Sequence, residues 1–346
     1  MSTPAEMGSS TRFRSAFTPR FDPGPGAVGQ IVEAVRAAEQ AGYDDVWLAD
    51  AGGVDALTLA AIVLDRTERI RVGIAVVPAY TRTPAVLAAT VATLADLAPG
   101  RFALGLGTSS EAMINGWHGL TLERPVARMR ETLALLRDIF AGERTSFTGQ
   151  TLRSTGYRQP ALTTSVPILL AALRPRMTEL AVTAADGIIL NLFPLGALDS
   201  LMAGIHAAAA RVGREPAEIE VVSRFQGQVV ANETEHAAAR DAFRFHFTPY
   251  FANRVYNAFL AEVGYPDIAA ELESRARVGN WAGARACLTD ELVDDIAVIG
   301  DAEHFRERLG TYAEAGIGTP IMFCLSADPE HQRRTFDVLR TAGAVR

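Results

Sequence analysis

The feature that most constrains the fold is a regular alternation of short apolar segments with segments of helical periodicity. About eight strand-like segments occur, and most of them are apolar without the polar–apolar alternation of a half-exposed strand, as expected for parallel strands buried on both faces. They lie at 13–17, 46–49, 70–77, 102–106, 166–172, 187–190, 219–230 and 319–325. Eight such strands interleaved with helices predict an α/β chain folded as a (β/α)8 barrel. A doubly wound open sheet is the alternative.

The alternation breaks in two places. Residues 143–160 contain a short stretch typical of a hairpin, and residues 233–297 are mostly helical and rich in aromatic side chains. The chain of 346 residues is long enough for one large domain or two small ones. We interpret it as a single barrel domain, 1–346, with a mostly helical insertion at about 233–297.

Composition excludes several function classes. A net charge of −7 argues against binding to nucleic acid or to a membrane surface. No apolar run is long enough to span a bilayer, and the N-terminus lacks the apolar core of a signal peptide. Two cysteines are too few for a disulfide framework. We therefore expect a cytoplasmic protein that binds neither nucleic acid nor membrane.

The chain contains no lysine, so all 33 of its basic residues are arginines. Schiff-base chemistry and a lysine-dependent phosphate loop are therefore excluded. The six histidines never occur at the spacings of common metal sites, and we expect no metal site.

A glycine-rich strand is the first candidate site. Gly105 and Gly107 leave room for close backbone approach at its end, and polar residues follow at once. Ligands of α/β proteins bind at the carboxyl ends of parallel strands. Those polar residues, Thr108, Ser109, Ser110 and Glu111, therefore indicate a binding site, with an ordinary strand-to-helix turn as the alternative. The stretch lacks the third glycine of the dinucleotide fingerprint. No such fingerprint follows the first strand either, which favours the barrel over the open sheet.

A second candidate is the turn from Ala171 to Met177, between a strand and a helix. Free backbone amides and the positive end of the helix dipole favour an anion there. Arg174 and Arg176 add charged donors, and arginines at the start of a helix are unfavourable unless an anion balances them. Surface charge without a ligand is the alternative.

With these segments in order, the chain resembles the bacterial luciferase-like monooxygenase superfamily, and within it the oxidoreductases that use coenzyme F420. The residues that carry the resemblance lie at 42–50, 72–84, 101–111, 171–191 and 295–300. Members are (β/α)8 barrels with insertions before strands 5 and 8, the two places where the alternation breaks.

The resemblance implies a flavin or deazaflavin site. Asp50 corresponds to a polar residue near the ring, and Ala75-Val76 to a non-proline cis peptide behind it. Ala51 replaces the catalytic histidine of the related sugar-phosphate dehydrogenases, which makes that activity improbable. The implied cofactor contacts are Asp50, Ala75, Val76, Gly107, Thr108, Ser109, Ser110, Ala171, Ala172, Leu173, Arg174, Arg176, Met177 and Asn191.

The resemblance implies hydride transfer between coenzyme F420 and a small organic substrate. Asp50 and Glu111 are the first candidates for donating or accepting the proton, and His118 is the next candidate. An FMN-dependent monooxygenase and a catalytically silent flavin-binding barrel are the alternatives. Related barrels commonly form homodimers through helices flanking strands two to four, so we expect a homodimer in which the alanine-rich helix at 84–97 takes part.

Overall fold

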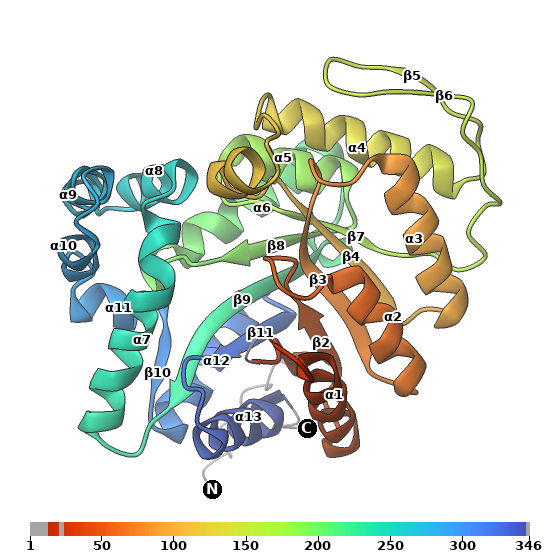
Figure 1. Cartoon of the computed structure of the whole chain (residues 1–346). Coiled ribbons are helices and arrows are strands. Elements are labelled where there is room, and N and C mark those ends of the chain that lie inside the picture. The colour runs from red at the N-terminus through yellow and green to blue at the C-terminus, as the bar shows by residue number, and fades with distance from the viewer. Residues whose placement is uncertain (1–12, 21–23, 344–346) are drawn as a thin grey trace, which may run out of the picture.

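The computed structural model, which describes residues 13–20 and 24–343, contains a closed parallel barrel (Figure 1). Each strand pairs in parallel with its neighbours in the order β9–β11–β1–β2–β3–β4–β7–β8, and β8 returns to β9. The eight strands are β1 (Ala16–Phe17), β2 (Asp45–Leu48), β3 (Arg71–Pro78), β4 (Phe102–Gly107), β7 (Ile168–Ala171), β8 (Gly187–Asn191), β9 (Glu220–Val229) and β11 (Thr319–Cys324). The predicted (β/α)8 barrel is confirmed, and the open sheet is excluded.

Helices cover the outside of the barrel and follow the strands in turn (Figure 1). Several begin at a side chain that accepts a hydrogen bond from a first-turn amide, as Asp55, Thr83 and Asp301 do. The helices of the barrel are α1 (Ala27–Ala41), α2 (Ala56–Arg66), α3 (Pro84–Leu97), α4 (Pro125–Phe140), α5 (Pro175–Ala184), α6 (Leu198–Val212), α12 (Ala302–Glu314) and α13 (Pro329–Gly343). Short helical segments lie at Ala112–Trp117 (π-helical), Leu195–Ala197 and Pro216–Glu218.

The barrel interior is filled around a single large side chain. The indole of Trp47 is fully buried and lies against Gly73 of the next strand, where a Cβ atom would be 2.3 Å from the ring. The residues of this inner core are Ala16, Trp47, Ala75, Ala103, Leu169, Ile189, Val222 and Ile321. Because side chains alternate along a strand, this core fixes which residues of each strand face inward.

Two insertions interrupt the barrel, before its fifth and its eighth strand. The first contains the antiparallel hairpin β5 (Ser146–Thr148) and β6 (Arg153–Thr155). The second contains α7 (Glu233–Phe251), α8 (Arg254–Glu262), α9 (Pro266–Arg277), α10 (Trp281–Ala286), α11 (Asp290–Ile296) and the short strand β10 (Val298–Gly300). Strand β10 pairs in parallel with the end of β9 and lies outside the closed barrel. It is a ninth parallel strand beside the eight that the sequence predicts.

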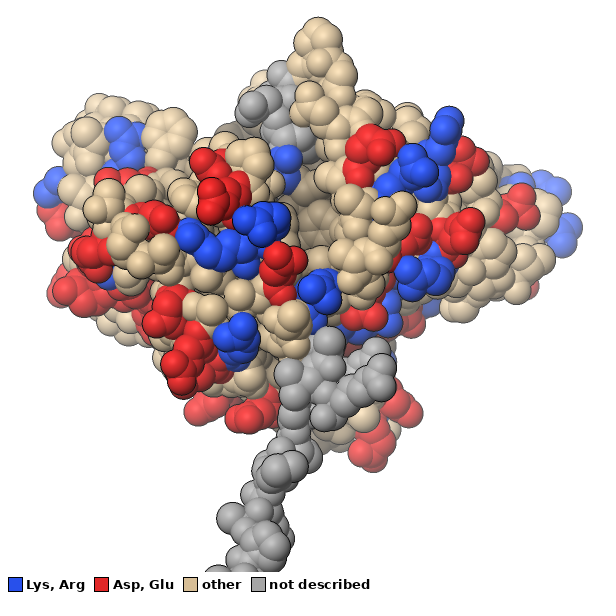
Figure 2. All heavy atoms as spheres, turned by 90° about the horizontal axis from the view of Figure 1, so that it is seen from below, with Lys and Arg blue, Asp and Glu red and all other residues tan. Residues whose placement is uncertain are grey.

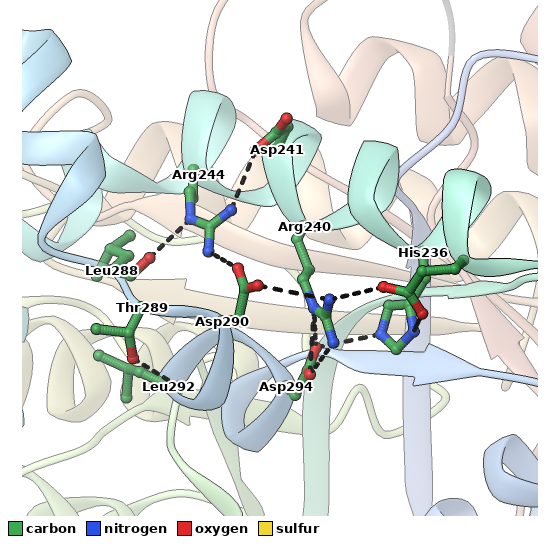
Figure 3. Close-up of polar contacts among 10 residues, drawn as sticks. His236, Arg240, Asp241, Arg244, Leu288, Thr289, Asp290, Leu292 and Asp294 are labelled. Carbon is green, nitrogen blue, oxygen red and sulfur yellow. Dashed lines mark hydrogen bonds and ion pairs between the residues drawn. The ribbon is translucent and has the colours of Figure 1, made fainter.

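Ion pairs join helix α7 to helix α11 of the second insertion (Figure 3). Arg240 of α7 places Nη2 2.6 Å from Oδ2 of Asp294 on α11, and Arg244 pairs with Asp290. Hydrogen bonding from Arg244 holds the pKa of Asp290 below its usual range. His236 Nε2 lies 3.3 Å from Oδ1 of Asp294. Helix α7 is therefore held to α11 along its first half.

Charges of both signs are intermingled over most of the face shown in Figure 2. Within residues 13–20 and 24–343, no helix combines the length and apolarity that a membrane crossing needs.

The carboxylate of Glu131 on α4 anchors the loop of the first insertion. It accepts hydrogen bonds from the amides of Gln150, Thr151 and Leu152 at 2.6–2.9 Å and from the Thr151 hydroxyl at 2.7 Å. Burial raises the pKa of Glu131, but these hydrogen bonds outweigh burial and hold the pKa below its ordinary value. The charged carboxylate therefore stabilises the folded state.

We expect Glu131→Gln to lower the free energy of unfolding at pH 7 by about 2 kcal/mol, because the charge-assisted hydrogen bonds are lost. A group whose pKa is lowered on folding stabilises the folded state at pH values above its unfolded pKa, which is about 4.3 for Glu. This stabilisation is lost as the pH falls through the folded pKa. Urea unfolding should show the two proteins converging below about pH 4.3. The exposed Glu307→Gln is the control, and a gap that widens in acid would contradict the assignment.

Candidate active site

Small residues form one side of the barrel mouth, at the carboxyl ends of β3, β4 and β7. A Cβ atom on Gly107 would lie 2.5 Å from Cγ2 of Val76 and 3.5 Å from Cβ of Ala171. These three residues therefore meet at the top of the inner core. We refer to these three small residues as the wall of Val76, Gly107 and Ala171.

The end of β3 is irregular. The peptide bond between Ala75 and Val76 is cis, as the resemblance implies, and the pairing with β4 shifts register between Ile74 and Val77. The shift is a bulge that turns the chain at the mouth of the barrel.

The two glycines of β4 have different surroundings. A Cβ atom on Gly105 would lie 2.0 Å from the carbonyl oxygen of Ile74 and 2.6 Å from Cδ1 of Ile189. The close backbone approach expected at Gly105 is therefore made by the neighbouring strand β3 rather than by a ligand. Gly107 lies at the mouth, against Val76 and Ala171.

The loop after β4 presents backbone donors. The amides of Thr108, Ser109 and Ser110 donate to no residue in the described part of the chain. Ser109 has a positive φ of 62°, and Ser110 Oγ accepts from the amide of Met113 at 3.3 Å. All three residues are half-buried. This loop can therefore offer amides to an acceptor at the mouth.

The turn between β7 and α5 also presents donors. The amides of Leu173, Arg174 and Arg176 have no acceptor among the described residues, whereas the amide of Ala172 donates to Ile189. Arg174 forms an exposed ion pair with Glu262 of α8. Arg176 is exposed and makes no ion pair within the described ranges. Three free amides beside a helix N-terminus and one free guanidinium can hold an anion. Met177 lies half-buried in the first turn of α5.

The three candidate proton-transfer residues lie in different surroundings. Asp50, with a side chain 12% exposed, places Oδ2 2.5 Å from Nη1 of Arg82, which follows β3 and also pairs with Asp55. Glu111 and His118 are both exposed and flank the π-helical segment after β4. Asp50 alone of the three is largely buried, and no hydrogen bond or ion pair within the described ranges joins any two of them.

The π-helical segment folds back over the loop after β2. Trp117, 61% exposed, lies over Gly52, where a Cβ atom would be 3.3 Å from the indole. The loops after β2 and β4 are thereby in contact at the rim.

Polar side chains form the next part of the mouth, on β8 and β9, which follow β7 around the barrel. Asn191 and Arg224 are register partners on these neighbouring strands, and Gln226 follows two residues later on the same face. Gln226 Nε2 donates to Asn191 Oδ1 at 3.1 Å, and Asn191 Nδ2 donates to the hydroxyl of Tyr256 at 2.9 Å. The second insertion is thus joined to the barrel mouth through α8.

Burial raises the pKa of Tyr256 to about 12, despite the hydrogen bond from Asn191 and the nearby charge of Arg224. The phenol therefore keeps its proton at neutral pH. Sequence reasoning did not identify Arg224 or Gln226, although polar residues at alternate positions of an otherwise apolar strand were a usable signal.

No group of three or more His, Cys, Asp or Glu side chains is placed to hold a metal ion within 13–20 and 24–343.

Comparisons with known proteins agree with this geometry. The sequence model of the luciferase-like monooxygenase family matches residues 10–319. A Mycobacterium tuberculosis protein named "Putative coenzyme F420-dependent oxidoreductase" is 31% identical over 320 residues, which cover 86% of this chain and 91% of the relative.

Two solved structures share the fold. The coenzyme F420-dependent tetrahydromethanopterin reductase of Methanopyrus kandleri superposes with a TM-score of 0.75 at 18% identity, covering 97% of this chain and 98% of the other. A type II Baeyer–Villiger monooxygenase of Pseudomonas putida in complex with FMN gives a TM-score of 0.67 at 15% identity, covering 96% and 98%. The family match over most of the chain, with the closed barrel and its two insertions, shows that this chain belongs to the luciferase-like monooxygenase family.

Proposed function

We propose that the protein is a coenzyme F420-dependent oxidoreductase that transfers a hydride between the deazaflavin and a small organic substrate. The observation that carries the proposal is the turn between β7 and α5, where the free amides of Leu173, Arg174 and Arg176 lie beside the free guanidinium of Arg176. This donor set fits a phosphate. The M. tuberculosis relative, named for this cofactor, supports the choice.

The residues of the mouth fit a flavin-like cofactor in three places. The turn at 171–177 would hold its phosphate, and the free amides of Thr108 to Ser110 would contact its polyol chain. The wall of Val76, Gly107 and Ala171 would support its ring. The bound deazaflavin supplies a carbon that accepts or donates hydride, while the protein orients the two reactants. Asp50, held by Arg82, is our candidate for positioning the proton on the substrate side.

An FMN-dependent monooxygenase is the second candidate, because the FMN-binding Pseudomonas structure shares the whole fold. A silent flavin-binding barrel is the third, since Ala51 offers no proton-transfer group. Titrating the purified protein with coenzyme F420 and with FMN, followed by fluorescence quenching, separates the first two. We expect tighter binding of coenzyme F420, and preference for FMN would overturn the proposal. Turnover with any hydride acceptor would exclude the third.

We expect Arg176→Ala to weaken coenzyme F420 binding about tenfold, because a charge-assisted hydrogen bond to phosphate contributes about 1.5–3 kcal/mol. Arg174→Ala should have a smaller effect, because its guanidinium is paired with Glu262. Coenzyme F420 carries further acidic groups on its tail, so its affinity should fall more than that of FMN. The fluorescence titration measures both, and equal affinity for wild type and Arg176→Ala would mean that this arginine is only a surface charge.

A further inference from the structure

Arg71 and Arg224 both lie on inward-facing positions of barrel strands, and of these two only Arg71 has a counter-charge. Arg71, at the amino-terminal end, lies 2.6 Å from both Asp45 and Glu220. Arg224, near the mouth, donates from Nη1 to the carbonyl oxygen of Ala75 at 3.3 Å, and its Nε is buried with no partner. No carboxylate in the described part of the chain lies within ion-pairing distance of Arg224.

Gln226, Asn191 and Tyr256 form a chain of hydrogen bonds near Arg224, in which each side chain donates to the next. The amide of Gln226 donates to Asn191, and Asn191 in turn donates to the oxygen of Tyr256. The phenolic hydrogen of Tyr256 finds no acceptor among the described residues. The chain therefore ends in a donor that is left free near Arg224, the register partner of Asn191.

A half-buried guanidinium without a counter-ion and a phenol without an acceptor are both unfavourable, because each loses hydration that no protein group replaces. A ligand with a negatively charged oxygen satisfies both. We propose that Arg224 and Tyr256 form a binding site for an anionic oxygen group of the carboxylate class in the barrel mouth. Gln226 and Asn191 position the Tyr256 hydroxyl within it.

The identity of the molecule that supplies this oxygen rests on the proposed function. The contact from Arg224 to Ala75 holds the guanidinium beside the cis peptide, next to the wall of Val76, Gly107 and Ala171. The group is therefore either a carboxylate on the substrate or a ring oxygen of the cofactor that carries negative charge. Both sources would present a negatively charged oxygen to Arg224 and Tyr256. They differ in whether the bound cofactor itself occupies the site.

The test uses the ligand-free full chain with ¹⁵N-labelled arginine. The Arg224 Nε–H resonance is assigned as the one missing in Arg224→Gln, and sodium acetate is titrated in at constant ionic strength. We expect acetate to shift this resonance while sodium chloride and acetamide leave it in place. In Arg224→Gln, acetate affinity, followed on the acetate signal, should fall at least about tenfold, and in Tyr256→Phe about two- to tenfold. The exposed Arg36→Gln should bind acetate like wild type.

Repeating the titration with saturating coenzyme F420 distinguishes the sources. If the cofactor abolishes the acetate response and Arg224→Gln weakens cofactor binding, the ring edge occupies the site. If the response persists and cofactor affinity is unchanged, the substrate carries the anionic group. The proposal is overturned if acetate leaves the Arg224 resonance unmoved and Arg224→Gln binds the cofactor as wild type does. Failure of wild type to bind coenzyme F420 would instead count against the proposed function, because the acetate titration does not depend on it.

Discussion

Gly105→Ala is expected to lower the free energy of unfolding by at least about 3 kcal/mol, at the upper end of the usual cost of overpacking a core. The new Cβ atom would lie 2.0 Å from the carbonyl oxygen of Ile74. That carbonyl belongs to β3, which pairs with β4 on both sides of the bulge. Relief of the clash therefore requires the two strands to separate, whereas a flexible side chain would simply turn aside.

Urea unfolding of Gly105→Ala and Gly204→Ala measures the effect against a matched control. Gly204 lies in α6, and nothing is within 4 Å of the Cβ atom that alanine would add. Alanine should stabilise that helix by about 0.5–1 kcal/mol, because glycine loses more backbone entropy on folding. If the two variants changed stability alike, the close approach of β3 to Gly105 would be contradicted.

Local patterns explain why much of the fold was predictable. The alanine-rich helix expected at 84–97 has those bounds in the structure, because the proline at its start and the Pro99-Gly100 pair just beyond its end are local signals. The first strand is shorter than predicted, Ala16–Phe17 in place of 13–17, because only these two residues pair with β2 and β11. Strand β10 gave no clear signal, since its three residues pair with a segment far away in the sequence.

In the candidate site, too, the features set by local sequence were predictable, and those that depend on long-range contacts were not. The turn at 171–177 and the loop at 108–110 are continuous in sequence, so their donors were predictable from residue type and spacing. The pairing of Asp50 with Arg82 and the chain from Gln226 through Asn191 to Tyr256 join separate elements. Such contacts depend on strand register and on the placement of the second insertion, which the sequence pattern does not contain.

The largest electrostatic effect is expected at the other end of the barrel, from Asp45→Asn. The carboxylate of Asp45 is fully buried and accepts hydrogen bonds from Arg14, Arg71 and the Trp47 indole. Its nearest contacts, at 2.5 and 2.6 Å, are to Nη2 of the two arginines. Asparagine would remove the charge that balances them and place an amide where two guanidinium groups donate.

We expect Asp45→Asn to lower the free energy of unfolding by about 3–5 kcal/mol, the usual cost of removing one partner from a buried ion pair. Glu33→Gln is the control, because Glu33 pairs with Arg36 on an exposed helix face, where an ion pair contributes at most about 1 kcal/mol. Urea unfolding at pH 7 measures both. A change below about 1 kcal/mol for Asp45→Asn would contradict the role of this network in closing the barrel.

The same variant tests whether the two ends of the barrel act independently. Asp45 begins β2 at the amino-terminal end, whereas Arg176 and the free amides beside it follow β7 at the carboxyl end. In barrels of this class the amino-terminal end contributes stability and the carboxyl end carries the chemistry. The folded fraction of Asp45→Asn should therefore bind coenzyme F420 as wild type does, while Arg176→Ala should lose affinity without losing stability. Weaker cofactor binding by folded Asp45→Asn would mean that the Trp47 core transmits changes from the amino-terminal end to the mouth.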